Sequence, residues 1–428
     1  MFMNKIWGLI NAISRTDTWQ SLTYCDVLLA CGDADRGYCY KGKRYAQMID
    51  SLGDLLKQND LSVHSVSHRL SFCTGEKAYG TPVSVNRELV RIAMCARMVS
   101  LVKGRIAGSY WRETKLKQLW KNILSRCTPK AVISIQPDVG LCNAGHDLGI
   151  PIFDLQHGLI SDTEDNPYYW SDNLQKQEST DLPHGFLCWD KSSAEKLLPI
   201  TQKKKFTVRV IGNPWFVRFI NPHPQDDLVR LEIDHCSELQ GGLPIILVTL
   251  QYNLSYYACD YVNNGVMADC LETVIQETSD QYYWNLRLHP SQLSGNEGMY
   301  VQKYLKKQFG KLKNVEWETC SHVALPSLLS VANLHITHFS ATAIEASWMG
   351  VCTGLLDPHI CEGGKHEDFY VNERKLGFAE VLPLDVISIK KFINSSLAKN
   401  KSEKILLQQH MVCINSFVDE IKNGGISA

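Results

Sequence analysis

The sequence of 428 residues lacks any run of about 18 consecutive apolar residues, the length that a membrane-spanning helix requires. It contains no CxxC pair and no Cys/His spacing typical of a zinc module, which excludes that class of metal site. It has no GxGxxG fingerprint, which disfavours a dehydrogenase. Lys and Arg number 44 and Asp and Glu number 45, so the net charge of −1 excludes a histone-like role and nonspecific nucleic-acid binding.

The 15 cysteines are scattered along the chain, and several stand in apolar stretches, among them Cys95, Cys188 and Cys352. Their number is odd, and no secretory signal is recognisable. We interpret them as small reduced core residues rather than a disulfide framework. This interpretation predicts a cytoplasmic protein.

Short apolar runs alternate with stretches of helical periodicity, which is the rhythm of a parallel α/β sheet. In the first half we predict strands at residues 24–31, 131–136, 151–155, 186–189 and 207–211. Helices are expected between them at residues 44–57 and 139–148. In the second half we predict strands at residues 244–250, 282–288, 334–338 and 351–356. Helices are expected there at residues 266–277, 324–332 and 341–349.

We therefore predict an α/β fold of two tandem Rossmann-like, doubly wound domains that face a cleft. The first domain is placed at residues 1–212 and the second at 243–385, with a linker at 213–242 that is rich in Asn-Pro and His-Pro breakers. Residues 386–428 form C-terminal helices that are candidates to cross back onto the first domain.

Charge is unevenly distributed between the two halves. Residues 1–210 hold 27 basic and 21 acidic side chains, a balance of +6, and the stretch 86–130 alone holds 11 basic and 2 acidic ones. That stretch is either a solvated helix face or a surface for anionic lipid headgroups or a phosphate-bearing lipid acceptor. In the second case the amphipathic residues Phe2, Ile6, Leu9 and Ile13 would assist it.

Polar residues crowd the exit of the strand predicted at 151–155. Asp154, Gln156 and His157 stand there, followed by Gly158. Ligands of open α/β sheets collect beyond the carboxyl ends of the strands, and a carboxylate, an amide and an imidazole together are suited to acid/base or nucleophilic chemistry. The alternative is a turn in which these side chains satisfy backbone groups.

The strand predicted at 282–288 ends in Arg287, Leu288, His289 and Pro290. Proline stops the strand and leaves His289 at its mouth, where the ring can donate to a phosphate oxygen. Arg287 is a candidate phosphate ligand or a structural partner.

The strongest pattern is a strand followed by a hydroxyl-rich turn and a helix. Ser340, Ala341 and Thr342 make the turn, and Glu345 lies on the first turn of the expected helix. The hydroxyls and the free N–H groups of a helix start suit an anion, and Glu345 can reach ribose hydroxyls. The alternative is an ordinary Ser/Thr helix cap.

Gly212, Asn213 and Pro214 follow the strand predicted at 207–211. At a domain boundary we interpret them as a hinge that would let a cleft open and close.

Taken in order, these motifs resemble the GT-B glycosyltransferases of bacterial capsule and lipopolysaccharide O-antigen biosynthesis. The resemblance rests on the QHG at 156–158, the strand-end HP at 289–290, and the segment EASWMGV at 345–351 after the Ser/Thr turn. Similar motifs occur in Kdo and sialyl transferases that use CMP-sugars and in CDP-glycerol glycerophosphotransferases. The sequence departs from the sialyltransferases in lacking the D/E-D/E-G motif, for which Gly32-Asp33-Ala34-Asp35 has the wrong form.

The resemblance implies a metal-independent, cofactor-free transfer of a sugar from a nucleotide-sugar donor to a glycan or lipid-linked glycan acceptor. It implies that the first domain binds the acceptor, with Asp154 as the catalytic carboxylate and Gln156 and His157 positioning substrate. His289 and the 340–342 turn would hold the donor phosphate, and Glu345 would lie near the ribose. It further implies a cytoplasmic protein that contacts the membrane peripherally and binds no nucleic acid. The alternatives are a non-hydrolysing nucleotide-sugar epimerase, a CDP-polyol phosphotransferase and a non-catalytic glycan-binding homologue.

Overall fold

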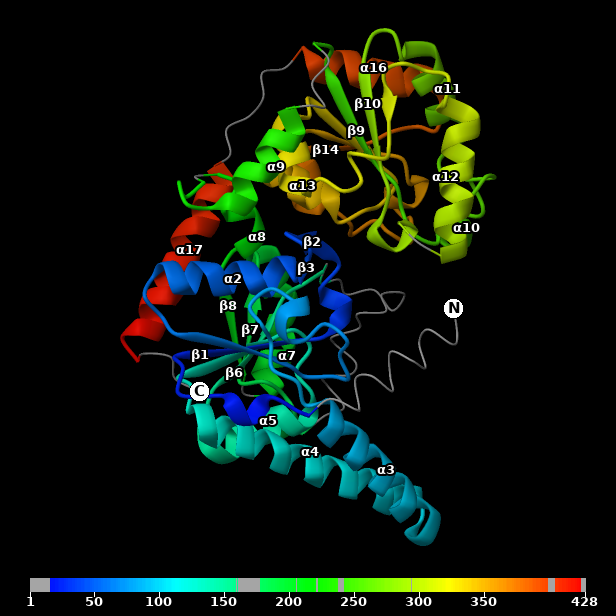
Figure 1. Ribbon diagram of the computed structural model, residues 1–428. Coiled ribbons are helices and arrows are strands. Elements are labelled where there is room, and N and C mark those ends of the chain that lie inside the picture. Colours follow the sequence, from blue (N-terminus) through cyan, green and yellow to red (C-terminus); the bar gives the residue numbers. More distant parts are fainter. Residues whose placement is uncertain are drawn as a thin grey trace. The chain divides into compact units, whose positions relative to one another are not determined.

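A computed structural model describes most of the chain. The described residues are 16–158, 160, 178–204, 206–220, 222–237, 242–293, 295–398 and 405–424. They form two units (Figure 1). The N-terminal unit comprises Met1–Val217 and Gln409–Ala428, and the C-terminal unit comprises Arg218–Gln408.

The N-terminal unit is built on a parallel sheet of six strands in the order β4-β1-β5-β6-β7-β8. The strands are β1 (Val27–Cys31), β4 (Val63–Ser67), β5 (Ala131–Ser134), β6 (Ile152–Leu155), β7 (Gly185–Cys188) and β8 (Thr207–Val210). Most of the central strands are buried along their whole length, as expected of a sheet with helices on both faces. The strand order reverses between β1 and β5, which makes that edge the expected position for a ligand.

Helices and a small hairpin surround this sheet. The hairpin pairs β2 (Tyr38–Tyr40) with β3 (Lys43–Tyr45). The helices of this part are α2 (Gln47–Gln58), α3 (Asn86–Lys103), α4 (Arg105–Cys127), α5 (Val139–Leu148), α7 (Lys191–Lys204) and α8 (Pro214–Val217). Trp120, Ile123 and Leu124 of α4 pack into the core formed by β1 and β5, which fixes that half of the helix to the sheet.

The C-terminal unit contains a second parallel sheet of six strands in the order β11-β10-β9-β12-β13-β14. The strands are β9 (Ile245–Thr249), β10 (Tyr283–Arg287), β11 (Val315–Glu316), β12 (Leu334–Thr337), β13 (Thr353–Leu355) and β14 (Ala379–Val381). Numbered within the unit, the order is the 3-2-1-4-5-6 order of dinucleotide-binding sheets, with the reversal between β9 and β12.

The helices of the C-terminal unit cover both faces of its sheet. They are α9 (Asp227–Ser237), α10 (Leu254–Tyr257), α11 (Asp269–Thr278), α12 (Gly295–Phe309), α13 (Leu325–Val331), α14 (Thr342–Trp348), α15 (Val371–Lys375) and α16 (Val386–Leu397). Trp284 at the centre of the main core is fully buried, and Phe392 and Ile393 of α16 pack into the same core. The helix α16 therefore belongs to this unit.

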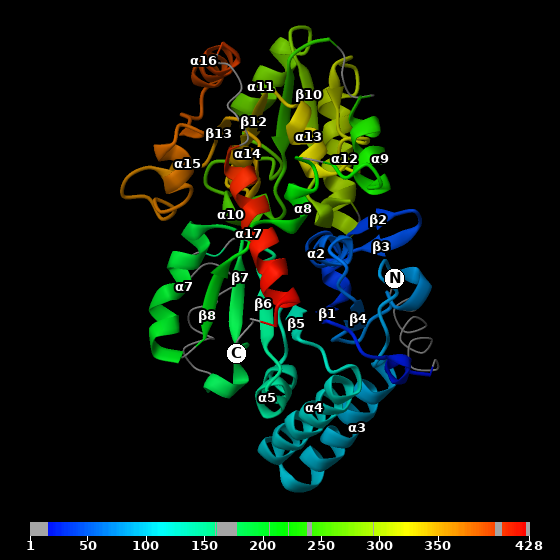
Figure 2. The same ribbon diagram turned by 90° about the vertical axis from the view of Figure 1, so that its left-hand side faces the viewer.

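The helix α17 (Ile405–Lys422) returns to the N-terminal unit from residue 409 onward. It lies along β6 and β8 (Figure 2), where Phe417 meets the ring of Phe153 and Glu420 pairs with Arg209. Gly212 and Asn213, predicted as a hinge with Pro214, are fully buried beneath α17. The side chain of Asn213 accepts hydrogen bonds from the N–H groups of Trp215 and Phe216 at 3.0 and 3.1 Å, so it caps α8.

The predicted α/β fold with two parallel sheets is confirmed, and each predicted strand overlaps an observed one. The strands that the prediction missed are β4, β11, β14 and the β2–β3 hairpin. Of these, β4 and β14 lie at sheet edges and carry polar side chains, and β11 has only two residues, so none of them forms a continuous apolar run.

Replacing Gly212 tests whether α17 packs closely against the chain after β8. Gly212 has φ +83°, and a Cβ there would lie 2.6 Å from Cβ of His410. We expect Gly212→Ala to lower the free energy of unfolding by about 1–2 kcal/mol for the left-handed backbone and a further 1–3 kcal/mol or so for the overpacking. Gly149→Ala is the control, since Gly149 has φ +65° with no atom within 4 Å of its added Cβ. Equal losses in urea unfolding would contradict the close approach of α17.

Candidate functional site

In the N-terminal unit, Asp154 points into the protein at the carboxyl end of β6. It is 2% exposed, and its Oδ1 accepts a hydrogen bond from the backbone N–H of Gln136 at 2.9 Å. Burial raises the pKa of this carboxyl well above its usual range. Gln136 itself has φ +52°, a strained conformation for a residue other than glycine. Asp154 therefore holds the chain as it leaves β5, and its predicted catalytic role stays a prediction.

Gln156 uses both ends of its amide to fix the turn that follows β6. Its Oε1 accepts from the N–H of Trp189 at 2.8 Å, and its Nε2 donates to the carbonyl of Gly158 at 3.0 Å and to Oγ of Ser193 at 3.1 Å. The side chain is 4% exposed. These bonds orient the 156–158 turn, and they leave Gln156 suited to position the neighbouring His157.

His157 is the most accessible of the three side chains predicted at this strand end, since it is half-buried where Asp154 and Gln156 are buried. Partial burial lowers the pKa of its imidazole, while the nearby Asp35 acts to raise that pKa and Arg69 acts to lower it. A neutral, partly accessible imidazole beside a carboxylate is able to accept a proton from a hydroxyl group.

Sequence analysis missed the other members of this cluster, which stand at the exits of β1, β4 and β5. Asp35 follows β1, His68 and Arg69 follow β4, and Gln136 follows β5. Arg69 donates to the side chain of Gln136 at 3.2 Å, and Nε2 of His68 lies 2.8 Å from the carbonyl oxygen of Ile135. The strand-end rule applied to residues 151–155 would have found Asp35, because the strand before it was predicted.

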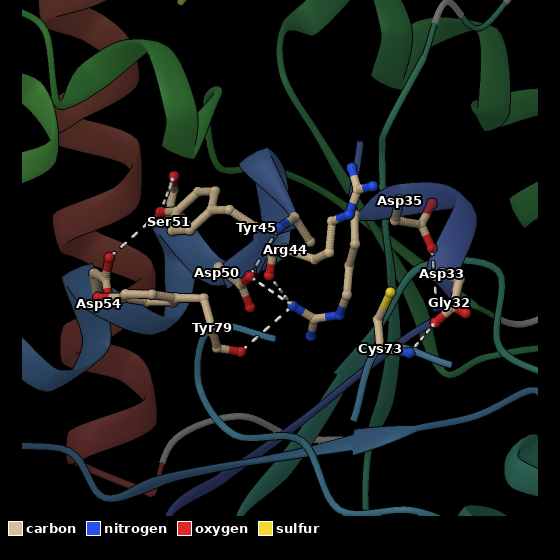
Figure 3. A network of polar contacts seen from close by, with 12 residues as sticks. Gly32, Asp33, Asp35, Arg44, Tyr45, Asp50, Ser51, Asp54, Cys73 and Tyr79 are labelled. Carbon is tan, nitrogen blue, oxygen red and sulfur yellow. Dashed lines mark hydrogen bonds and ion pairs between the residues drawn. The ribbon is translucent and has the colours of Figure 1, made fainter. Parts of the chain in front are cut away.

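A polar network secures the loop that carries Asp33 and Asp35 (Figure 3). Asp33 accepts from the N–H of Phe72 at 2.6 Å and from the hydroxyl of Ser71, and Asp35 accepts from the N–H of Gly32 at 3.0 Å. These bonds join the exit of β1 to the segment after β4. Asp33 thus has its structural partners in the segment after β4, and Asp35 has one within its own loop.

The next residue, Arg36, anchors the same loop to α2. Its Nη1 donates to Asp50 at 2.8 Å, and both side chains are about as buried as core residues, at 3% and 2% exposure. Burial raises the pKa of Asp50 to about 6 even though Arg36 opposes that rise. Because Asp50 also accepts from the N–H of Ala46 at 2.8 Å, the ion pair fixes the start of α2 relative to the strand-end loop.

In the C-terminal unit, Arg287 lies at the end of β10 and is bound to the backbone. Its Nη1 donates to the carbonyls of Cys320 and Val323, both at 2.5 Å. The carboxyl of Glu345 on α14 lies within its electrostatic reach: burial raises the pKa of Glu345 to about 7, and Arg287 acts against that rise. Arg287 therefore holds the 320–323 segment by hydrogen bonds, which is a structural role. Its charge also acts on the carboxyl of Glu345, which is an electrostatic role.

His289 begins the single turn η5 (Pro290–Gln292) and remains exposed. Its Nδ1 accepts the N–H of Ser291 at 3.1 Å, so the proton of the neutral ring is assigned to Nε2. Burial of part of the ring and the charge of Arg287 lower its pKa. An exposed, neutral imidazole that carries its proton on Nε2 can donate a hydrogen bond to an anion without itself being charged.

The turn before α14 is closed by its own hydroxyl groups. Oγ of Ser340 lies 3.0 Å from Oγ1 of Thr342 and accepts from the N–H of Thr342 at 3.3 Å. The cap residue of α14 is Ala341, and no side chain caps the helix start, so the ordinary Ser/Thr cap offered as the alternative is not formed. The phosphate role of the 340–342 turn stays a prediction.

Further polar residues at the exits of β9, β12 and β13 were not predicted as site residues. Gln251 after β9 accepts from the N–H of Phe339 at 2.7 Å. His338 after β12 is 3% exposed, and burial lowers its pKa to about 4. Asp357 after β13 is joined to Nδ1 of His366 at 2.6 Å. These residues extend the cluster across the reversal point of the sheet.

The comparisons with known proteins support the fold. No family model matches the chain, and no curated protein matches it significantly. Among solved structures, the UDP-GlcNAc 2-epimerase of Methanocaldococcus jannaschii is similar with a TM-score of 0.55 and 12% identity over 91% of this chain and 99% of that one. The S. aureus MnaA structure with UDP gives 0.52 and 14% over 92% and 97%. The wall teichoic acid polymerase TagF gives 0.52 and 12% over 99% and 94%.

These similarities confirm the predicted two-domain GT-B fold. At such identities they establish the fold alone, and they include both an epimerase and a polymerase. Within the described residues, no helix is long and apolar enough to cross a membrane.

The raised pKa of Glu345 predicts a pH dependence of stability. Its pKa rises from the ordinary value of 4.5 to about 7, so the folded protein favours the protonated carboxyl. This contribution is fully present below about pH 4.5 and is lost as the pH rises through about 7. We expect Glu345→Gln to remove that decline in the urea midpoint, whereas Glu380→Gln, at an exposed position on β14, retains it. A decline of the same size in both variants would refute the assignment.

Proposed function

We propose that the chain is a GT-B glycosyltransferase that moves a sugar from a nucleotide-activated donor to a surface-polysaccharide or lipid-linked acceptor. The observation that carries the proposal is the group of side chains at the carboxyl edge of the C-terminal sheet, on both sides of its reversal point. There His289, Ser340 and Glu345 follow β10 and β12 of a sheet with the strand order of nucleotide-binding proteins. In this proposal the C-terminal unit binds the donor.

His289 would stabilise the leaving nucleoside phosphate. As the bond to the anomeric carbon breaks, negative charge gathers on the phosphate oxygen, and Nε2–H of His289 is the proposed donor to it. The loss of one such donor costs about 2.7–4 kcal/mol in comparable oxyanion sites. The hydroxyls of Ser340 and Thr342 would contact the phosphate, and Glu345 would accept from the ribose hydroxyls.

In the N-terminal unit, His157 would take the proton of the acceptor hydroxyl. It is the half-buried member of its cluster, and Asp35 lies near enough to stabilise the charge that its ring then acquires. The burial of Asp154 and its bond to Gln136 favour a positioning role, so the proposal assigns proton transfer to His157. Gln156 would hold the His157 turn in place.

A nucleotide-sugar epimerase is the second candidate, because one of the three similar structures reported above is a UDP-GlcNAc 2-epimerase and another is bound to UDP. An epimerase would convert the free nucleotide sugar with no acceptor present. A CDP-polyol phosphotransferase, suggested by the similarity to TagF, would instead prefer a cytidine nucleotide.

A thermal-shift screen with CMP, CDP, UDP, GDP and dTDP tests donor binding. A nucleotide at 100 times its Kd stabilises the native state by about 2.7 kcal/mol, which is a shift of several degrees. We expect one nucleotide to raise the melting temperature, and His289→Ala to reduce that shift. His235→Ala, at an exposed position on α9, is the matched control. If no nucleotide raises the melting temperature, the chain is not a nucleotide-dependent enzyme.

The pH dependence of turnover, measured with the donor that the thermal-shift screen identifies, distinguishes the role of His157 from that of Asp154. We expect His157→Gln to lower kcat by about 10²–10⁴-fold and to abolish the acid limb of the pH profile, with nucleotide affinity unchanged. Asp154→Asn is expected to lower stability and retain the acid limb. If the acid limb is lost in Asp154→Asn and retained in His157→Gln, Asp154 is the catalytic residue and the assignment to His157 is wrong. Turnover of the donor without any acceptor would favour the epimerase.

A further inference from the structure

The α3–α4 hairpin carries an exposed apolar stripe that no part of the described chain covers. Its large side chains are between 62% and 88% exposed. They are Met94, Met98, Leu101, Val102, Ile106 and Tyr110. Their helical spacing puts them on one side of each helix around Gly104, and we call residues 94–110 the hairpin tip. Exposed apolar groups gathered in this way mark a surface that binds something.

Charge around the tip is of one sign. From residue 91 to residue 112 the chain has five basic side chains and no acidic one. Arg97, Lys103 and Arg105 are exposed, and within the described residues none of them forms an ion pair. The stripe is therefore bordered by positive charge that is available to a partner.

The two helices of the hairpin pack closely against each other, so the hairpin is an ordered element. Gly108 of α4 is buried against α3, where an added Cβ would lie 1.8 Å from Oγ of Ser100. The buried side chains that α4 contributes to the core of the N-terminal unit, among them Leu119, Trp120 and Ile123, all lie in its far half, and Trp111 packs against that core while only partly buried. The Gly104 end consequently extends away from the sheet of its own unit (Figure 1).

We propose that the hairpin tip docks on an anionic lipid bilayer, with the apolar side chains entering the interface and the basic ones meeting the headgroups. Apolar burial and attraction to anionic lipid together are what hold amphipathic helices at a membrane surface. A second copy of the chain fits less well, because a two-fold contact would set the same basic tip against itself. The proposal goes beyond donor chemistry and does not depend on it. Phe2, Ile6, Leu9 and Ile13 lie outside the described residues.

Co-sedimentation of the full chain with vesicles tests the proposal. We expect binding to vesicles of phosphatidylglycerol mixed with phosphatidylcholine, and little binding to phosphatidylcholine alone. Binding should weaken as salt rises, because the Debye length falls from about 10 Å at 0.1 M to about 3 Å at 1 M. Lys103→Gln with Arg105→Gln should lower the partition coefficient about 25-fold, at about five-fold for each basic residue near the surface.

The apolar part of the stripe is tested by Leu101→Ser with Val102→Ser and Ile106→Ser, all at exposed positions that leave the fold intact. This variant should lose vesicle binding while its circular dichroism and melting temperature match the parent. Two matched controls lie in the C-terminal unit: Ile387→Ser, at a position 80% exposed, and Lys306→Gln with Lys307→Gln on α12. The proposal is overturned if both tip variants still bind vesicles. It is also overturned if the parent protein binds no vesicles but self-associates, and a tip variant abolishes that self-association.

Discussion

Each backbone group that leaves a buried strand must find a hydrogen-bond partner, and this constraint shapes the carboxyl edges of both sheets. In each unit a buried side chain from one strand exit serves the backbone of the next. Asp154 bonds to Gln136, Gln156 to Trp189, and Gln251 to Phe339. Gln292 continues the series by bonding to the N–H of His289 and the carbonyl of Gln251. The accessible residues at these edges are held in place by this buried layer.

The buried layer also explains how far the sequence could predict the site. The apolar runs before Gln156 and His289 identify two strand ends correctly, because a fully buried parallel strand is a continuous apolar segment. Periodicity does not reveal which polar residue at such an end turns inward. Asp154 and His157 look equally suited to chemistry in the sequence, yet one is buried against a backbone N–H and the other is half-exposed. Asp35 was not predicted as a site residue, because the Gly32-Asp33-Ala34-Asp35 sequence was compared with a family motif. Its position just after a predicted strand was not considered.

The histidines at the strand ends share one electrostatic property. Burial lowers the pKa of His157, His289 and His338, so their rings are neutral at neutral pH. A phosphate held in this way is bound by directed hydrogen bonds rather than by net charge. The basic residues of the chain are instead concentrated on α3 and α4. The proposed attraction to anionic lipid therefore comes from this hairpin, and the proposed chemistry comes from the strand ends.

The assignment of α17 to the N-terminal unit has a consequence for the order of folding during synthesis. Buried side chains of that unit include His410, Phe417 and Ile421, which are synthesised only after the whole of the C-terminal unit. The C-terminal unit is continuous in sequence and is complete earlier. Vectorial synthesis usually favours the N-terminal domain. Here the β6–β8 face of the N-terminal sheet stays uncovered until α17 has been synthesised. The N-terminal unit is therefore the part that most needs chaperone protection.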